Sequence, residues 1–97
     1  MKNQSYNKDY ICPVCGYVLW FRPWDGDSPY EICPCCRIQF EYDDHVAGNK
    51  ELRPTFYRGW RGKWKKDGMQ WGSKGIEEPP EGWNPEEQLK NIPEEYR

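Results

Sequence analysis

The chain has 97 residues, 14 of them basic and 16 acidic, and apolar residues make up only 36% of it. This length favours a single domain, and the net charge of -2 with a sequence pI near 5.4 argues against a protein dominated by nucleic-acid binding. So polar a composition would suggest disorder, but six Trp, seven Tyr and three Phe can supply a small core. Domains of this size commonly reinforce such a core with disulfide bonds or a metal ion.

The cysteines indicate whether disulfide bonds or a metal ion reinforce this core. Five is an odd number, which fits a pure disulfide framework poorly. The first residues contain no apolar stretch of the kind that a secretory signal carries, and the longest apolar run, at 17–21, is far shorter than the roughly 20 residues of a membrane-spanning helix. We therefore expect a cytoplasmic protein without membrane contact, in which clustered cysteines are metal ligands rather than disulfide partners.

Residues 1–9 are polar and are expected to form a flexible N-terminus. The next part of the chain, 10–44, is expected to be a zinc-ribbon module, because it contains three segments rich in β-formers. We predict short antiparallel strands at 17–22, 30–32 and 38–42, with a turn at the DGDSP sequence of 25–29. In the last strand Ile38, Phe40 and Tyr42 alternate with polar residues, which is the pattern of a half-buried strand.

Four of the five cysteines have the spacing of a metal site. Cys12 and Cys15 form one C-x2-C pair, Cys33 and Cys36 form another, and seventeen residues separate the pairs. Two thiolates spaced in this way can face one ion from a single turn, and two such turns complete a tetrahedron of four sulfurs, which is a structural rather than a catalytic arrangement. We expect these four residues to hold one zinc ion; buried reduced thiols without a metal are the alternative.

The fifth cysteine, Cys35, takes the place that Val14 has in the first pair. We expect it to be a non-ligand, either packed or exposed as a small side chain. A redox-active thiol and a swapped register, in which Cys35 replaces Cys36, are the alternatives. Arg37 stands where Gly16 follows the first pair, and because glycine permits positive φ, the arginine predicts a strained or altered turn.

The second half of the chain, 45–97, is expected to be an aromatic-rich helical extension that packs on the ribbon and ends in an acidic tail. Pro54 suits the first turn of one helix and Gly68 the position after its last turn. The apolar residues of this helix recur every four positions, at Leu52, Phe56, Trp60 and Trp64. A second helix is predicted to begin at Asn84 as N-cap, followed by Pro85, and Pro93 limits its length.

These patterns together predict an α+β fold that is small and stapled by a metal: an N-terminal zinc ribbon of short antiparallel strands, followed by one or two helices packed on it. Charge is segregated along the chain. The net charge is -3 over 1–49, +6 over 50–75 and -5 over 76–97. We expect the basic part to balance the acidic tail.

The sequences ICPVCGY and SPYEICPCCRIQFEYDD resemble the small bacterial cysteine-rich proteins of the CPCC type, a zinc-ribbon-like group. The resemblance covers roughly 10–44, and WKKDGMQW with PPEGWNPEEQL is similar to the C-terminal part of bacterial proteins that carry this ribbon. It implies the same four ligands that the spacing predicts and implies no activity. Two features depart from the group: Arg37 replaces the usual glycine, and the order of the CPCC and CPVC knuckles is inverted.

The sequence YICPVCGY also resembles the first knuckle of rubredoxin, and ICPCC resembles its second. Rubredoxins have a much longer gap between the knuckles and lack a basic second half. Iron, and with it electron transfer, is therefore the alternative to zinc, because tetrahedral thiolate sites accept both ions.

The function that the sequence favours is a structural zinc protein acting as a protein-interaction module, with a bacterial immunity or regulatory factor as one form of it. Tryptophan, tyrosine and arginine are enriched at interface hot spots. They are concentrated in the basic half, so the candidate partner-binding residues are Arg58, Trp60, Arg61, Trp64 and Lys65. Nucleic-acid binding through 50–75, with basic groups on phosphates and aromatic rings stacked on unpaired bases, is the alternative.

Catalysis is not expected. His45 is the only histidine, and we expect it at the surface rather than on the metal. Asp43 and Asp44 are adjacent and would point to opposite sides, so they are interpreted as turn-forming or solvated residues rather than an acid–base pair. No set of nucleophile, base and orienting group is visible in the sequence, and the protein is predicted not to be an enzyme.

Overall fold

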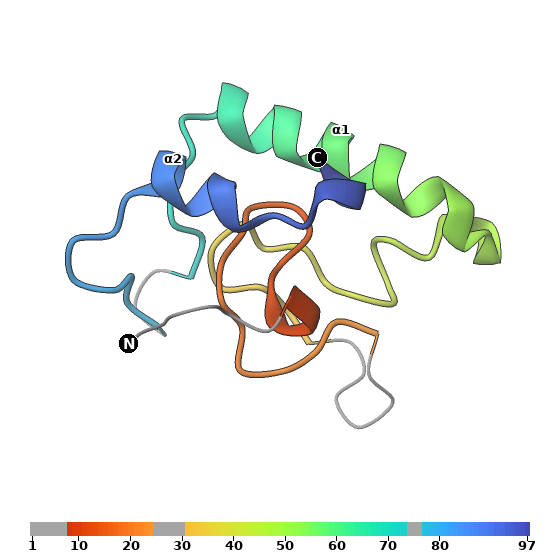
Figure 1. Cartoon of the computed structure of the whole chain (residues 1–97), viewed down its shortest axis with the longest axis horizontal. Helices are drawn as coiled ribbons and strands as arrows, with labels where there is room; N and C mark the ends of the chain where they lie inside the picture. Colours follow the sequence, from red (N-terminus) through yellow and green to blue (C-terminus); the bar gives the residue numbers. More distant parts are fainter. Residues whose placement is uncertain (1–7, 25–30, 74–76) are drawn as a thin grey trace.

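The computed structural model describes residues 8–24, 31–73 and 77–97. Its two α-helices both lie in the second half of the chain: α1 (Arg53–Lys66) and α2 (Pro85–Gln88). Figure 1 shows α1 extending across the coiled N-terminal part, with the C-terminal end of the chain against α1. Short 3-10 helices occupy Lys8–Tyr10, Val46–Gly48, Lys50–Leu52, Leu89–Asn91 and Glu94–Tyr96.

Isolated antiparallel bridges stand where short strands were predicted. One joins Ile11 to Val18 and the other joins Ile32 to Gln39, and the described residues form no extended strand. The prediction of strands at 17–22, 30–32 and 38–42 is therefore wrong in the described part, although the pairing is antiparallel. The predicted turn at 25–29, Tyr30 and the first seven residues lie outside the described residues.

The segment 38–42 shows why a ladder does not extend. Ile38 and Phe40 are buried, as their alternation predicts. Tyr42 is 68% exposed, because the chain turns here: the N–H groups of Tyr42 and Asp43 both donate back to the carbonyl of Gln39. A turn that uses these backbone groups leaves none for a neighbouring strand.

Helix α1 forms where the four-residue spacing of apolar residues predicts it. Pro54 lies in the first turn, where its missing N–H leaves no bond unmade, and Gly68 follows the C-cap residue Asp67. Two side chains of the helix are buried, Tyr57 and Trp64. Leu52, the first residue of the predicted stripe, lies before the helix and is half exposed, and Tyr57, outside the stripe, is the most buried residue of α1.

Helix α2 begins as predicted. The side-chain oxygen of Asn84 accepts hydrogen bonds from the N–H groups of Glu86 and Glu87, so it satisfies two donors that the helix itself leaves unpaired. The α-helix is short and continues as a 3-10 helix up to the residue before Ile92, which is buried. Pro93 then ends the helical segment, as its sequence position predicts.

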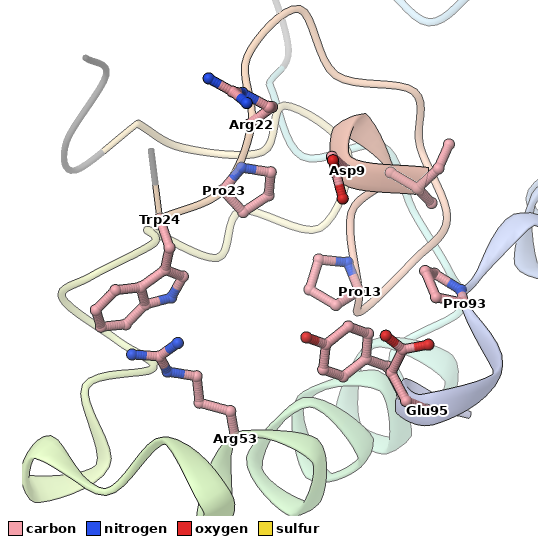
Figure 2. A pocket seen from close by; sticks show the side chains of 10 residues that line it. Asp9, Pro13, Arg22, Pro23, Trp24, Arg53, Pro93 and Glu95 are labelled. Atoms are coloured by element: carbon pink, nitrogen blue, oxygen red, sulfur yellow. The ribbon is translucent and has the colours of Figure 1, made fainter. Parts of the chain in front are cut away.

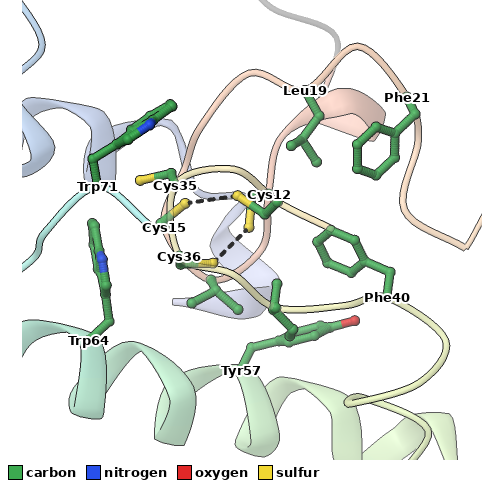
Figure 3. Packing of buried hydrophobic residues seen from close by; sticks show 13 residues of the cluster. Cys12, Cys15, Leu19, Phe21, Cys35, Cys36, Phe40, Tyr57, Trp64 and Trp71 are labelled. Atoms are coloured by element: carbon green, nitrogen blue, oxygen red, sulfur yellow. Dashed lines mark hydrogen bonds between the residues drawn. The ribbon is translucent and has the colours of Figure 1, made fainter. Parts of the chain in front are cut away.

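The core is built around cysteines. Figure 3 shows them in the middle of the buried cluster, with Tyr57 and Trp64 reaching it from α1 and Leu19 and Phe21 on another side. Phe40 packs edge-on against Phe21, with ring centroids 6.0 Å apart. Because this core is small, the folding of the knuckles and the helices depends on the interaction that holds the cysteine sulfurs together.

Candidate metal centre

The two cysteine knuckles have the same backbone geometry. The N–H of Gly16 donates to the carbonyl of Cys12, and the N–H of Arg37 donates to the carbonyl of Cys33, each at 2.9 Å. Both donor residues have positive φ, 85° at Gly16 and 71° at Arg37. A non-glycine residue in this conformation costs about 1–2 kcal/mol, so the strained turn predicted at Arg37 is present.

The four spaced cysteines bring their sulfurs together. Cys12 Sγ lies 3.7 Å from Cys36 Sγ, and Cys15 Sγ lies 3.7 Å from Cys33 Sγ. All four sulfurs lie within 4.8 Å of one another. A regular tetrahedron with Zn–S bonds near 2.3 Å has sulfurs about 3.8 Å apart, so the cluster has the dimensions of a four-thiolate site.

The cluster is enclosed by the protein. All four cysteines are buried, and none forms a disulfide. Desolvation raises the pKa of Cys15, Cys33 and Cys36. At Cys12, desolvation is outweighed by hydrogen bonds from the other three thiols, and its pKa lies well below the ordinary value. The sulfurs thus already stabilise one thiolate among them, and a divalent cation would favour ionisation of all four.

The fifth cysteine lies outside this cluster of four. Cys35 is fully buried, and its sulfur accepts a hydrogen bond from Nε2 of Gln88 at 3.3 Å. The same amide nitrogen donates to the carbonyl of Cys15 at 3.0 Å, so Gln88 connects the two knuckles to the end of α2. Cys35 is therefore a packed side chain, which is one of the two states predicted for it as a non-ligand.

The predicted partner-binding residues divide into two groups. Arg58 and Lys65 are exposed on α1. Trp60 donates its ring N–H to the carbonyl of Cys36 at 3.0 Å, and Trp64 is buried, with its ring N–H on the carbonyl of Gln70.

Arg61, which the sequence places with the partner-binding residues, turns inward. Its Nε donates to the carbonyl of Val14 at 2.6 Å and its Nη2 to the carbonyls of Pro13 and Tyr96 at 2.7 and 2.6 Å. This residue holds the loop of the first knuckle against α1. A sequence motif could not reveal this role, because all three acceptors are backbone groups far away in the chain.

Asp44 is the polar residue whose position the sequence did not indicate. It is completely buried, which corrects its interpretation as a solvated residue. It accepts hydrogen bonds from the ring N–H of Trp24 at 2.7 Å, the hydroxyl of Tyr57 at 2.5 Å and the N–H of Glu41 at 2.7 Å. These three donors compensate for burying a carboxylate. Asp43 instead accepts from a backbone N–H in a local turn, as predicted, and His45 is exposed.

Comparison with known proteins finds no family model, curated protein or solved structure that matches this chain. Among the helices of the described segments, none has the length and apolar character that crossing a membrane requires. The function of the protein is therefore to be inferred from its own geometry. What that geometry presents is a small cysteine-rich protein whose buried cluster of four cysteines suggests a metal site.

Proposed function

We propose that Cys12, Cys15, Cys33 and Cys36 bind one zinc ion and that this ion is a structural centre. The observation that carries the proposal is the convergence of four buried sulfurs, with two pairs that cross between the knuckles at 3.7 Å. Four thiolates leave no ligand position open for a substrate, so the centre stabilises the fold and does not catalyse. This function agrees with the resemblance to zinc-ribbon proteins of the CPCC type.

Metal analysis of the purified chain tests this proposal. We expect one equivalent of zinc per chain and a colourless protein. A strong chelator should remove the metal slowly and collapse the dispersed amide NMR spectrum, because the ligand-binding energy is part of the folding energy. A red protein with visible absorption would identify iron and a rubredoxin-like centre. A folded protein that contains no metal and ignores the chelator would refute the metal centre altogether.

We further propose that the fold held in this way serves as a protein-interaction module, through a groove on α1. The groove has a volume of about 500 Å³ and lies where Phe56, Trp60 and Trp64 meet the second knuckle at Cys36. Gly59 also lines it, and a side chain at this position would meet no atom within 4 Å. Glycine in a helix costs about 1 kcal/mol relative to alanine, and nothing in the described part of the chain requires it here.

The charges around this groove favour an acidic partner. Lys65 and Lys66 are exposed on α1, and within the described ranges no carboxylate pairs with either of them. Arg58 is also exposed but donates to the main-chain oxygen of Arg97 at 3.3 Å, and Lys63 pairs with Asp67 on the same helix. Arg58 and Arg61 thus bond to main-chain oxygens at the C-terminal end of the chain, whereas Lys65 and Lys66 present exposed charge that can attract an acidic ligand. We propose that the groove binds an acidic peptide segment that packs an apolar side chain against the aromatic rings lining it.

Nucleic acid is the weaker candidate for this surface. The ring N–H groups of Trp60 and Trp64 are bonded to backbone carbonyls, and Trp64 is buried in the core. A stacking platform needs aromatic faces open to bases. Among the described residues, the basic charge of α1 is the main feature that supports nucleic-acid binding, and a charge run by itself is common on solvated helices.

A matched pair of glycine substitutions tests the groove. Gly59→Leu fills the groove, whereas Gly62→Leu adds the same side chain at a position of α1 that also has nothing within 4 Å and does not line the groove. Both variants should fold at least as stably as the parent protein. Binding is measured on an array of short acidic and basic peptides. We expect the parent protein to bind acidic peptides that contain a Leu, Phe or Trp, and we expect this binding to weaken with salt. Gly59→Leu should lose the binding, and Gly62→Leu should keep it. Equal binding by both variants, or preferential binding of single-stranded DNA, would overturn the proposal.

A further inference from the structure

A second cavity shares no lining residue with the α1 groove, and none of the four clustered cysteines lines it. Its volume is about 420 Å³, within the range of small-molecule sites. Figure 2 shows that its walls come from distant parts of the chain: Pro13 of the first knuckle, Trp24, Arg53 at the start of α1, and Pro93 near the C-terminus. Three prolines and Ile11 make much of this wall apolar.

The guanidinium group of Arg53, which lines this cavity, is oriented before a ligand binds. The guanidinium carbon of Arg53 lies 3.2 Å from the centre of the Trp24 ring. That ring is itself fixed, because its N–H donates to the buried carboxylate of Asp44, which also holds the hydroxyl of Tyr57. Asp44 thus orients Trp24, and Trp24 orients the plane of the Arg53 guanidinium. Fixing a guanidinium before binding lowers the entropy lost when it pairs with a ligand.

Within the ranges 8–24, 31–73 and 77–97, the side chain of Arg53 donates to no acceptor. Among the described residues no carboxylate pairs with Arg53, and its Nε is buried without an acceptor. Because this Nε is buried, an acceptor that enters the cavity would pair with the terminal Nη groups of the guanidinium. A carboxylate is the acceptor whose two oxygens match the planar fork of a guanidinium.

The opposite side of the cavity is acidic. Figure 2 shows the carboxylates of Asp9 and Glu95 across the cavity from Arg53 and Trp24. Arg22 also lines the cavity, but its guanidinium is directed away from the centre. The exposed carboxylate of Glu95 would repel a multiply charged anion such as phosphate, and it would attract an ammonium group.

We propose that this cavity binds a small zwitterion of the amino-acid class, with its carboxylate on Arg53 and its ammonium group on the side of Asp9 and Glu95. The apolar part of the ligand lies against the prolines and Trp24. This chemistry is shared by free amino acids and by short peptides with free ends. The lining of this cavity includes none of the four clustered cysteines and no residue of the α1 groove, so a ligand here would contact neither of those sites.

Binding is measured by NMR on the full-length, metal-loaded protein, with the side-chain N–H signals of Arg53 and Trp24 as reporters. The probes are leucine, the dipeptide leucyl-leucine, isovalerate, which lacks the amine, and isopentylamine, which lacks the carboxylate. We expect leucine or leucyl-leucine to cause saturable shifts, and the one that binds more tightly identifies the free amino acid or the peptide as the ligand. Isovalerate and isopentylamine should bind at least about tenfold more weakly.

Two substitutions separate the proposed contacts from general effects. Arg53→Gln should weaken the tighter zwitterion at least about tenfold, whereas Lys50→Gln removes an exposed cation three residues before Arg53 that does not line the cavity and should leave binding unchanged. Glu95→Gln changes an exposed residue, so it keeps the test valid if Arg53→Gln fails to fold. This variant should bind leucine and isopentylamine more weakly than the parent protein does, and it should bind isovalerate equally well. The proposal is overturned if no probe saturates up to roughly 10 mM, if isovalerate binds as well as leucine, or if folded Arg53→Gln binds normally.

Discussion

Arg61 Nε donates a hydrogen bond of 2.6 Å to the carbonyl of Val14, although the two residues are 47 positions apart in the chain. Val14 lies inside the first knuckle, between the cysteines of its C-x2-C pair. The same guanidinium also reaches the carbonyl of Tyr96 near the C-terminus. One side chain therefore joins α1, the first knuckle and the end of the chain, and the backbone on which two of the sulfurs depend is fixed from outside the knuckle.

Replacing Arg61 should destabilise both the fold and the metal centre. Arg61→Lys keeps the charge but cannot reach three carbonyls with a planar fork, and hydrogen bonds to charged groups contribute about 1.5–3 kcal/mol each. We expect a loss of about 2–4 kcal/mol in the free energy of unfolding, measured by urea denaturation, with faster metal release to a chelator. Arg58→Lys, on the exposed face of α1, should change stability by less than about 0.5 kcal/mol. Equal effects of the two substitutions would contradict the role of Arg61.

The cysteines should differ in their effect on metal content. Cys33→Ser removes one of the four converging sulfurs, and we expect the zinc content to fall well below one equivalent and the N-terminal half to unfold. Cys35→Ser should keep one equivalent of zinc, because Cys35 lies outside the cluster of four and the serine hydroxyl can still accept from Gln88. Elemental analysis checks both variants. Loss of zinc in Cys35→Ser would show that Cys35, and not Cys36, is the fourth ligand.

Gly16 should tolerate no side chain. A Cβ at this position would overlap the carbonyl oxygen of Gln88, and the residue has a φ of 85°. Because the overlapping atom is backbone, Gly16→Ala should cost more than about 2 kcal/mol by moving the end of α2 away from the first knuckle. Gly62→Ala provides the control, since it lies in α1 with nothing within 4 Å and should stabilise the protein by up to about 1 kcal/mol. Thermal denaturation of the two metal-loaded variants gives opposite shifts if this is right.

Stability should fall at alkaline pH, in part through Tyr17. Burial of this phenol and its hydrogen bond to Glu77 raise the pKa of Tyr17 to about 12, above the ordinary value near 10. The folded state then holds the proton more tightly than the unfolded state does. The contribution of the Tyr17 proton to the free energy of unfolding is complete below about pH 10 and is lost as the pH rises from about 10 to about 12. Urea denaturation at pH 9 and 11 should show a smaller decrease for Tyr17→Phe than for the parent protein, and an identical decrease would exclude Tyr17 as a source.

Some features of the fold follow from residues that are close together in the chain. The start of α2 was predictable because Asn84 bonds to N–H groups only two and three residues away. The predicted strands failed for a related reason: β-formers at 38–42 favour extended backbone, but the turn that follows Gln39 takes up the same N–H groups. β-propensity describes how a residue fits into a sheet, and it cannot supply the neighbouring strand.

The sequence by itself predicted the two knuckles and favoured the register that leaves Cys35 out of the cluster of four, because a C-x2-C turn is made by hydrogen bonds within a few residues. Only the tertiary structure decided which polar side chains from distant parts of the chain meet. It turned Arg61 inward, buried Asp44 beneath Trp24 and Tyr57, and left Arg53 facing a cavity. These outcomes depend on polar groups that meet across long stretches of chain, and the free energy of burying such groups is set by partners that no local pattern encodes.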